Sequence, residues 1–183
     1  MTALVDAPTP AVVQTAAQES QQYLTFMLGG EVFAIGILHI KEIIEYGRLT
    51  TVPLMPAFIR GVINLRGAVV PVIDLSVRFN RAPVALTRRT CIVIIEVGAT
   101  EGHQDIGIVV DSVSEVLEIP ASQVEPAPSF GARIRSDFIH GMGKVNEQFV
   151  IILNVDKMLS VEEIALLVGT SAAVSDSMQA PRP

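Results

Sequence analysis

The amino-acid sequence predicts a mainly β protein built from two copies of one small β-barrel module. The first observation is that apolar residues gather in short runs rich in Val and Ile, which are typical of buried strands; such runs are Val69–Ile73, Cys91–Ile95 and Phe149–Leu153. The second is that the pattern of one half recurs in the other. Because a small module with many short strands has exposed edges unless it curls on itself, we expect each copy to form a small barrel.

The internal repeat runs through most of the chain. The stretch FIRGVINLRGAVVPVIDL at 58–75 aligns with FIHGMGKVNEQFVIILNV, which begins 80 positions later. Upstream, FAIGILHIKEIIE at 33–45 aligns with IGIVVDSVSEVLE 73 positions later, and YLTFM at 23–27 aligns with CIVII 68 positions later. The growing separation indicates loop insertions in the second half. We therefore expect one domain over 20–169, with two intertwined modules at roughly 20–85 and 86–159 and a helix at 160–169.

The first elements follow from local pattern. Residues 1–19 are rich in Ala, Pro, Thr and Gln without a period, which predicts a flexible N-terminal arm. The run YLTFML ends at the turn pair Gly29-Gly30, and an extended pattern resumes at 31–35. Four isoleucines then recur at three- and four-residue spacing, which predicts a short helix or helical turn; they are Ile37, Ile40, Ile43 and Ile44.

The later elements alternate strands with irregular connections. Residues 58–75 and 138–155 each read as a strand pair around a short polar turn, and PASQVEPAPSFGARI is a proline-rich connection. The final element is SVEEIALLVG, where Ser160 is suited to an N-cap and Gly169 to a stop, so we expect a helix. Residues 170–183 predict a flexible tail.

Composition excludes several classes of protein. Half of the 183 residues are apolar and mean hydropathy is +0.49, but no apolar run reaches the roughly 20 residues of a membrane helix. The N-terminus has no secretory pattern, and Cys91 is the single cysteine, so we expect a cytoplasmic protein without disulfides and without direct membrane insertion. The net charge of −6 argues against nucleic acid as a partner.

No motif for catalysis or metal binding stands out. The three histidines lack ligand spacing, and neither a P-loop nor a nucleophile elbow occurs; the histidines are His39, His103 and His140. A catalytic pair of carboxylates could be drawn from three residues, but carboxylates at such places are typical of strand caps or solvated positions. The three are Asp74, Asp111 and Glu115. We therefore expect a protein that is not an enzyme and needs no metal or cofactor.

Arg66 is the residue that the strand pattern does not explain. Its repeat equivalent is Asn146, so the module does not itself require arginine at this turn. One interpretation is a solvated turn residue. The other is an arginine held by a carboxylate and presented to a partner, since a guanidinium can bind a carboxylate on one side and still donate elsewhere. Glu42 is the carboxylate that we expect to pair with it.

Several motifs together resemble the bacterial chemotaxis coupling protein family, CheW. They are RGVINLRGAVVPVIDL, GIVVDSVSEVL, PAFIRG and EEIALL, and the resemblance extends from about Gln21 to Val168. It implies two SH3-like five-stranded barrels with short helices around a shared core. It also implies a non-enzymatic adaptor that links the cytoplasmic tip of methyl-accepting chemotaxis receptors to the regulatory domain of the histidine kinase CheA, and is thereby recruited to the inner face of the membrane.

The resemblance also implies a partner-binding surface. Arg66 matches the arginine of the family's Asn-Leu-Arg-Gly turn, and Glu42 matches the glutamate that pairs with it. A groove for the receptor helix would be lined by the strand over 107–110 and by two isoleucines. The implied residues are Arg66, Glu42, Asn64, Leu65, Gly67, Ile40, Ile43, Gly107, Val109 and Val110.

Gly36 departs from the family pattern, which often has Asp there; this puts local polar contacts in question.

Two alternative functions stay open. One is a paralogue that serves a pilus-motility or other chemosensory-like pathway. The other, from a different class, is a small β-barrel enzyme that uses Asp111 and Glu115.

Overall fold

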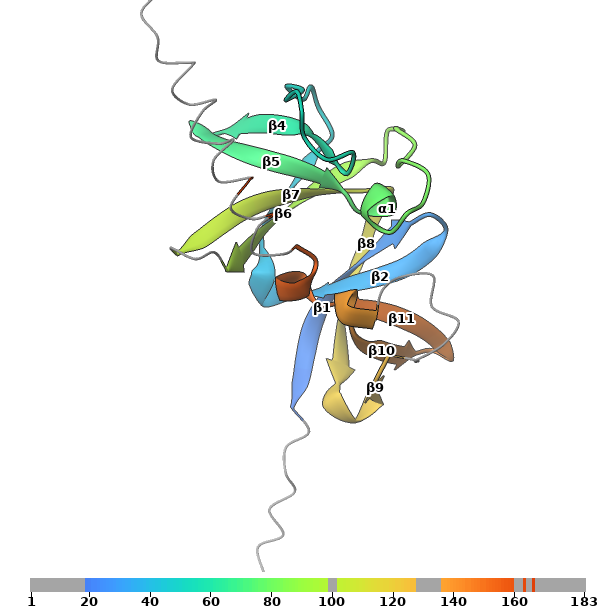
Figure 1. Ribbon diagram of the computed structural model, residues 1–183. Helices are drawn as coiled ribbons and strands as arrows, with labels where there is room; N and C mark the ends of the chain where they lie inside the picture. Colours follow the sequence, from blue (N-terminus) through green and yellow to red (C-terminus); the bar gives the residue numbers. More distant parts are fainter. Residues whose placement is uncertain (1–18, 99–101, 128–135, 160–162, 164–165, 167–183) are drawn as a thin grey trace, which may run out of the picture.

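Two β-sheets pack against each other in the computed structural model, which describes residues 19–98, 102–127, 136–159, 163 and 166 (Figure 1). One sheet has five strands in the order β3-β6-β7-β5-β4 and the other has six in the order β8-β1-β2-β11-β10-β9. The mainly β prediction is confirmed. No helix among these residues is long and apolar enough to span a membrane.

The five-stranded sheet uses the middle of the chain. Its β6–β7 and β4–β5 pairs are antiparallel hairpins, and β5 pairs with β7 in parallel. Its strands are β3 (Ile40–Glu45), β4 (Ile59–Leu65), β5 (Ala68–Asp74), β6 (Cys91–Gly98) and β7 (His103–Val110).

The six-stranded sheet combines the N-terminal hairpin with the second half of the chain. Here β1 and β2 lie between β8 and β11, and β2 pairs with β11 in parallel. Its strands are β1 (Ser20–Leu28), β2 (Glu31–Gly36), β8 (Ser112–Pro120), β9 (Val124–Glu125), β10 (Ile139–Val145) and β11 (Gln148–Leu153).

The sequence repeat reappears as an identical strand order. The series β3-β6-β7-β5-β4 corresponds, strand by strand, to β8-β1-β2-β11-β10. Even the parallel register matches, because Val72 lies opposite Gly107 just as Ile152 lies opposite Ala34, and these residues are repeat equivalents. The first hairpin of each half therefore lies in the sheet that the rest of the other half forms: β1–β2 in the six-stranded sheet and β6–β7 in the five-stranded sheet. The modules are intertwined, and a boundary at residue 85/86 does not divide the two sheets.

Two expectations need correction. The isoleucine spacing predicted a helix, but only Ile37–His39 forms a single 3₁₀ turn, and the following residues form β3. β-Branched residues favour strands, and β3 alternates half-buried and exposed residues with period two against β6. The second correction concerns barrel closure. One sheet has six strands, and neither is a hydrogen-bonded ring; the edge strand β4 gains only the isolated Thr50–Val62 bridge.

The helical segments are short, as expected. The one α-helical turn among the strands follows β5 and is capped by Asp74. The segments are α1 (Leu75–Arg78) and the 3₁₀ turns η1 (Ile37–His39), η2 (Ala121–Gln123), η3 (Ser136–Phe138) and η4 (Val155–Lys157). Glu163 and Leu166 are helical, but the rest of the predicted helix at 160–169 lies outside the described residues. So do the predicted tail and, apart from residue 19, the predicted arm.

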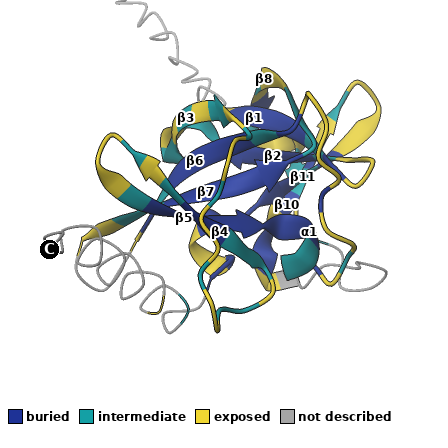
Figure 2. Ribbon diagram, turned by 90° about the horizontal axis from the view of Figure 1, so that it is seen from above, coloured by how far each residue is buried: buried dark blue, intermediate teal, exposed yellow. Residues whose placement is uncertain are grey.

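The core is shared between the two sheets, whose central strands are buried while the hairpin tips are exposed (Figure 2). A row of aromatic rings crosses it, with centroids about 6 Å apart; the row is Phe26, Phe33, Phe79 and Phe138. The guanidinium of Arg78 lies 4.9 Å from the ring of Phe58 and 5.0 Å from that of Phe138. Because these two rings are repeat equivalents, Arg78 links the two halves at their junction.

Candidate functional site

The turn between β4 and β5 presents Arg66 at the tip of a tight hairpin. Leu65 pairs with Ala68, so Arg66 and Gly67 form a two-residue turn. Both have positive φ angles, of 53° and 85°, as in a type I′ turn. The side-chain oxygen of Asn64 accepts a 2.9 Å hydrogen bond from the Gly67 amide, which holds the turn in this shape.

Arginine is unfavourable in this backbone conformation. A non-glycine residue with positive φ is strained, and Asn tolerates this region better than most residues. The equivalent turn between β10 and β11 has Asn146 at φ 49° and Glu147 at φ 64°. The same turn is thus made without arginine in the other sheet, so Arg66 is not explained by the needs of the hairpin.

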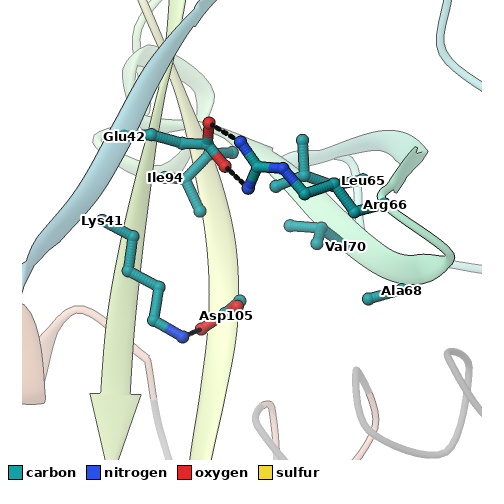
Figure 3. Close-up of a pocket in the computed structure, with 8 residues that line it drawn as sticks. All are labelled: Lys41, Glu42, Leu65, Arg66, Ala68, Val70, Ile94 and Asp105. Carbon is teal, nitrogen blue, oxygen red and sulfur yellow. Dashed lines mark hydrogen bonds and ion pairs between the residues drawn. The ribbon is translucent and has the colours of Figure 1, made fainter.

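A bidentate ion pair fixes the Arg66 guanidinium. Its Nη1 donates to Oε1 of Glu42 at 2.7 Å and its Nη2 donates to Oε2 at 2.9 Å (Figure 3). The pairing that the sequence predicted is confirmed. These hydrogen bonds and the carboxylate charge raise the pKa of Arg66, so the guanidinium keeps its charge. Its side chain is 77% exposed, against 24% for Glu42, and ion pairs this exposed stabilise a fold little.

The pair joins the two edges of the five-stranded sheet. Glu42 belongs to β3, the first strand of the sheet order, and Arg66 follows β4, the last. The sheet must therefore curl until its edges approach each other. Beneath the pair is a pocket whose floor is apolar, formed by the buried Val70 and Ile94, and whose rim is charged. Its lining comprises Lys41, Glu42, Leu65, Arg66, Ala68, Val70, Ile94 and Asp105 (Figure 3).

A second ion cluster lies on the opposite rim of this pocket. Lys41 Nζ is 2.8 Å from Asp105 Oδ1 and 3.0 Å from Glu96 Oε2, and Glu96 Oε1 is 3.6 Å from His103 Nδ1. Hydrogen bonds to Asp105 and then Glu96 raise the pKa of Lys41, and the bond from Lys41 lowers the pKa of Glu96. Sequence reasoning missed this cluster. Only the pairing of β3, β6 and β7 brings these residues together.

Comparison with known proteins identifies the family. The model of the CheW-like domain matches residues 22–163. The chain belongs to the CheW-like family. It is 39% identical to Chemotaxis protein CheW of Klebsiella aerogenes, over 86% of this chain and 93% of that protein. It is 30% identical to Protein FrzA of Myxococcus xanthus, over 84% and 93%.

A solved structure agrees with this assignment. The scaffolding protein TtCheW of Thermoanaerobacter tengcongensis superimposes with a TM-score of 0.72 at 30% identity, covering 80% of this chain and 94% of that one. The resemblance to the CheW family is thereby confirmed, and scaffolding is the function at the level that these relatives support.

The CheW-like fold brings only part of the predicted surface together. Arg66, Glu42 and Leu65 line the pocket, and Asn64 and Gly67 form the turn beside it. Ile43 is 43% exposed. Because neighbouring residues of a strand point to opposite faces, its side chain points away from that of Glu42. Ile40 is partly buried against the core.

The structure does not place the predicted groove residues on β7 at the surface of the chain. Gly107, Val109 and Val110 are buried, and β7 lies between β6 and β5 in the middle of the sheet. A Cβ at Gly107 would come within 2.7 Å of the Ile92 side chain. The apolar run was correctly identified as a strand, but its sequence could not reveal that both faces are covered.

Two of the three carboxylates considered for catalysis have other contacts. The buried Asp74 accepts hydrogen bonds from the Arg60 guanidinium and from the backbone amides of Ser76 and Val84. Asp111 accepts one from the Gly29 amide. Within the described part of the chain, no group of three or more His, Cys, Asp or Glu side chains is placed to hold a metal ion.

Proposed function

We propose that this CheW-like chain is a non-enzymatic adaptor that couples the cytoplasmic tip of chemotaxis receptors to the regulatory domain of the histidine kinase CheA. The observation that carries the proposal is Arg66, a strained, 77% exposed arginine held by Glu42 where the equivalent turn has Asn146. Membership of a family that includes the scaffolding protein TtCheW supports the adaptor role.

The geometry of Arg66 suits recognition of an oxygen acceptor on a partner. A guanidinium has five N–H donors, and the two bonds to Glu42 use two of them. The carboxylate restrains the side chain before a partner arrives, so less conformational entropy is lost on binding. A carboxylate or backbone carbonyl of the partner would complete the hydrogen bonds of Arg66.

The pocket beside Arg66 adds an apolar contact. Val70 and Ile94 form its floor, and Leu65 and Ala68 lie at its side. A partner helix that presents an aliphatic side chain next to an acidic one would place the first on this floor and the second on Arg66, as in other helix-in-groove complexes. Such a contact is small, and an array of receptors and kinases would strengthen it through multivalency.

The test is a binding titration with two matched variants. Arg66→Asn places in this turn the residue that the equivalent turn already uses, so the hairpin should keep its shape. Asn146→Arg places an arginine on the other hairpin. Against a receptor-tip fragment and a CheA regulatory domain, we expect wild type and Asn146→Arg to bind alike and Arg66→Asn to bind at least ten times more weakly to one partner, roughly the loss of one charge-assisted contact. Equal binding by all three would refute a role for Arg66.

A second pathway is the alternative within the same class. The similarity to Protein FrzA, which does not carry the chemotaxis name, shows that the family includes differently named members. A paralogue serving a pilus-motility or other chemosensory-like pathway would bind receptor and kinase fragments of that pathway in preference to those of chemotaxis. The same titration, repeated with both sets of fragments, separates the two.

A further inference from the structure

The N-terminal hairpin β1–β2 has its main pairing partners far away along the chain. It inserts between β8 and β11, which begin at residues 112 and 148. Polar contacts reinforce the insertion at the hairpin turn. The amide of Gly29 donates to the Asp111 carboxylate at 2.7 Å, the Asp111 amide donates to the Met27 carbonyl at 3.0 Å, and Arg81 pairs with Glu31 at 2.7 Å. The six-stranded sheet is therefore incomplete without this hairpin.

A short exposed segment joins the hairpin to the rest of the molecule. The single 3₁₀ turn Ile37–His39 contains no buried residue, and Leu38 is 96% exposed. The residues on either side, Gly36 and Ile40, already have extended backbone angles. If this one turn became extended, β2 would lead directly into β3 and the hairpin would separate from its own chain, with little loss of packing in the connection.

The equivalent hairpin β6–β7 is connected differently. It is followed by β8 after the single residue Asp111, and it is preceded by ninety residues of the same chain. Described elements flank it on both sides, α1 before it and β8 after it, so leaving its sheet would require both connections to move together. The N-terminal hairpin is joined to the rest of the described residues through the Ile37–His39 turn.

We infer that residues 20–36 can be exchanged between two copies of this chain, giving a dimer in which each six-stranded sheet receives β1 and β2 from the partner copy. All the hydrogen bonds and ion pairs named above would form again between copies, so the two states differ mainly in the Ile37–His39 turn and in the entropy of association. The Arg66–Glu42 pair lies wholly within residues 40–110. The exchanged dimer would therefore keep two such pairs and present them in one bivalent particle.

Exchange should occur when the sheet opens, so folding conditions decide the product. The hairpin's effective concentration within its own chain is of the order of 1 mM or above for so short a connection, and refolding near that protein concentration lets a second copy compete. Refolding at micromolar concentration should give the monomer. Once folded, the two forms should interconvert slowly, because the whole β1–β8 and β2–β11 pairing must break first.

Disulfide trapping tests the inference with the full chain. Gln22 and Glu118 are exposed register partners across β1 and β8. One copy carries Gln22→Cys and another Glu118→Cys, both with Cys91→Ser, and the mixture is refolded at high concentration and oxidised. Exchange predicts a disulfide between the two copies, because each cysteine then faces the other chain. Light scattering should show a dimer in the same sample.

A matched pair in the five-stranded sheet controls for random oxidation. Glu45 and the native Cys91 are register partners across β3 and β6, which stay in one copy in either state. A mixture of Glu45→Cys/Cys91→Ser with the wild-type chain should give little intermolecular disulfide. If the Gln22/Glu118 mixture gives no more than this control, the inference is overturned.

Shortening the connection provides a second, independent test. Deleting Leu38 removes a residue with almost no packing but should prevent the chain from turning back onto its own sheet, so the dimer fraction should rise several-fold. A folded Leu38 deletion that remains monomeric at high concentration would also overturn the inference. Neither experiment involves a receptor or kinase, so its outcome is independent of the proposed adaptor function.

Discussion

The β4–β5 and β10–β11 hairpins share one backbone design and differ in what they present. Both have a register shift after their first residue and a two-residue turn with two positive φ angles. Each also has one parallel neighbour, and these neighbours, β7 for β5 and β2 for β11, are repeat equivalents. One turn carries Arg66, paired with Glu42 beside a charged pocket, and the other carries Asn146 and Glu147. The comparison shows that the charges around the first hairpin are additions to a fold that forms without them.

The largest difference that we expect concerns the residues that end the two hairpins. Asp74 is fully buried and accepts hydrogen bonds from Arg60 and from three backbone amides, whereas its equivalent Asn154 is half-buried. Asp74→Ala should lower the free energy of unfolding by about 3–5 kcal/mol, because it leaves the Arg60 charge without its partner. Asn154→Ala should lower it by less than about 1 kcal/mol. Urea unfolding of both variants measures this, and equal losses would contradict the assigned role of Asp74.

The glycines at the register shifts sharpen the comparison. A Cβ at Gly61 would lie 2.5 Å from the Thr50 carbonyl oxygen, and φ there is 151°; a Cβ at Gly141 would lie 2.8 Å from the Glu125 carbonyl oxygen. Gly61→Ala should therefore cost about 2–4 kcal/mol, from backbone strain as well as crowding. Gly141→Ala should cost about 1–3 kcal/mol from crowding alone. Denaturant melts of the two variants rank them, and the reverse order would show that strain at Gly61 is unimportant.

Exchanging the turn residues should change stability little. Arg66→Asn loses an exposed ion pair but relieves an unfavourable φ angle, and Asn146→Arg does the opposite without an expected partner. Melting temperatures of both variants should stay within about 2 °C of wild type. Unfolding of Arg66→Asn in a circular dichroism melt at ordinary temperature would mean that the ion pair holds the sheet together and that Arg66 is structural.

The smallest effect that we expect concerns the ion cluster of Lys41, Glu96 and Asp105. The sequence of the other half does not repeat this cluster, because the repeat equivalent of Lys41 is Ser114. Lys41 lowers the pKa of Glu96, so this contact stabilises the fold above the ordinary pKa of a glutamate and is lost as pH falls through the lowered value. Lys41→Met should return the pKa of Glu96 toward its ordinary value. Titration of the Glu96 carboxyl by NMR measures this, and an unchanged pKa would exclude Lys41 as the cause.

Much of this architecture follows from local pattern. The Val- and Ile-rich runs and the repeat predict the strands and the common order of the two sheets, and Arg66 stands out because its equivalent is Asn146. The isoleucine spacing at 37–44 gave a wrong prediction of a helix, because short apolar segments fit a helical and an extended spacing almost equally well. The groove that includes Val109 and Val110 was implied by the family resemblance, and a run of apolar residues does not say which neighbours will cover it.

Residue types and the repeat were enough to predict most of the strands and the hairpin turns, and they singled out Arg66 as a residue that the hairpin does not need. Which half completes which sheet follows from long-range strand pairing. The same pairing brings Lys41, Glu96 and Asp105 into one ion cluster and buries β7 between two neighbours. The physical reason is that the pairing of distant strands depends on the edges that the rest of the chain leaves open, and no local pattern carries that information.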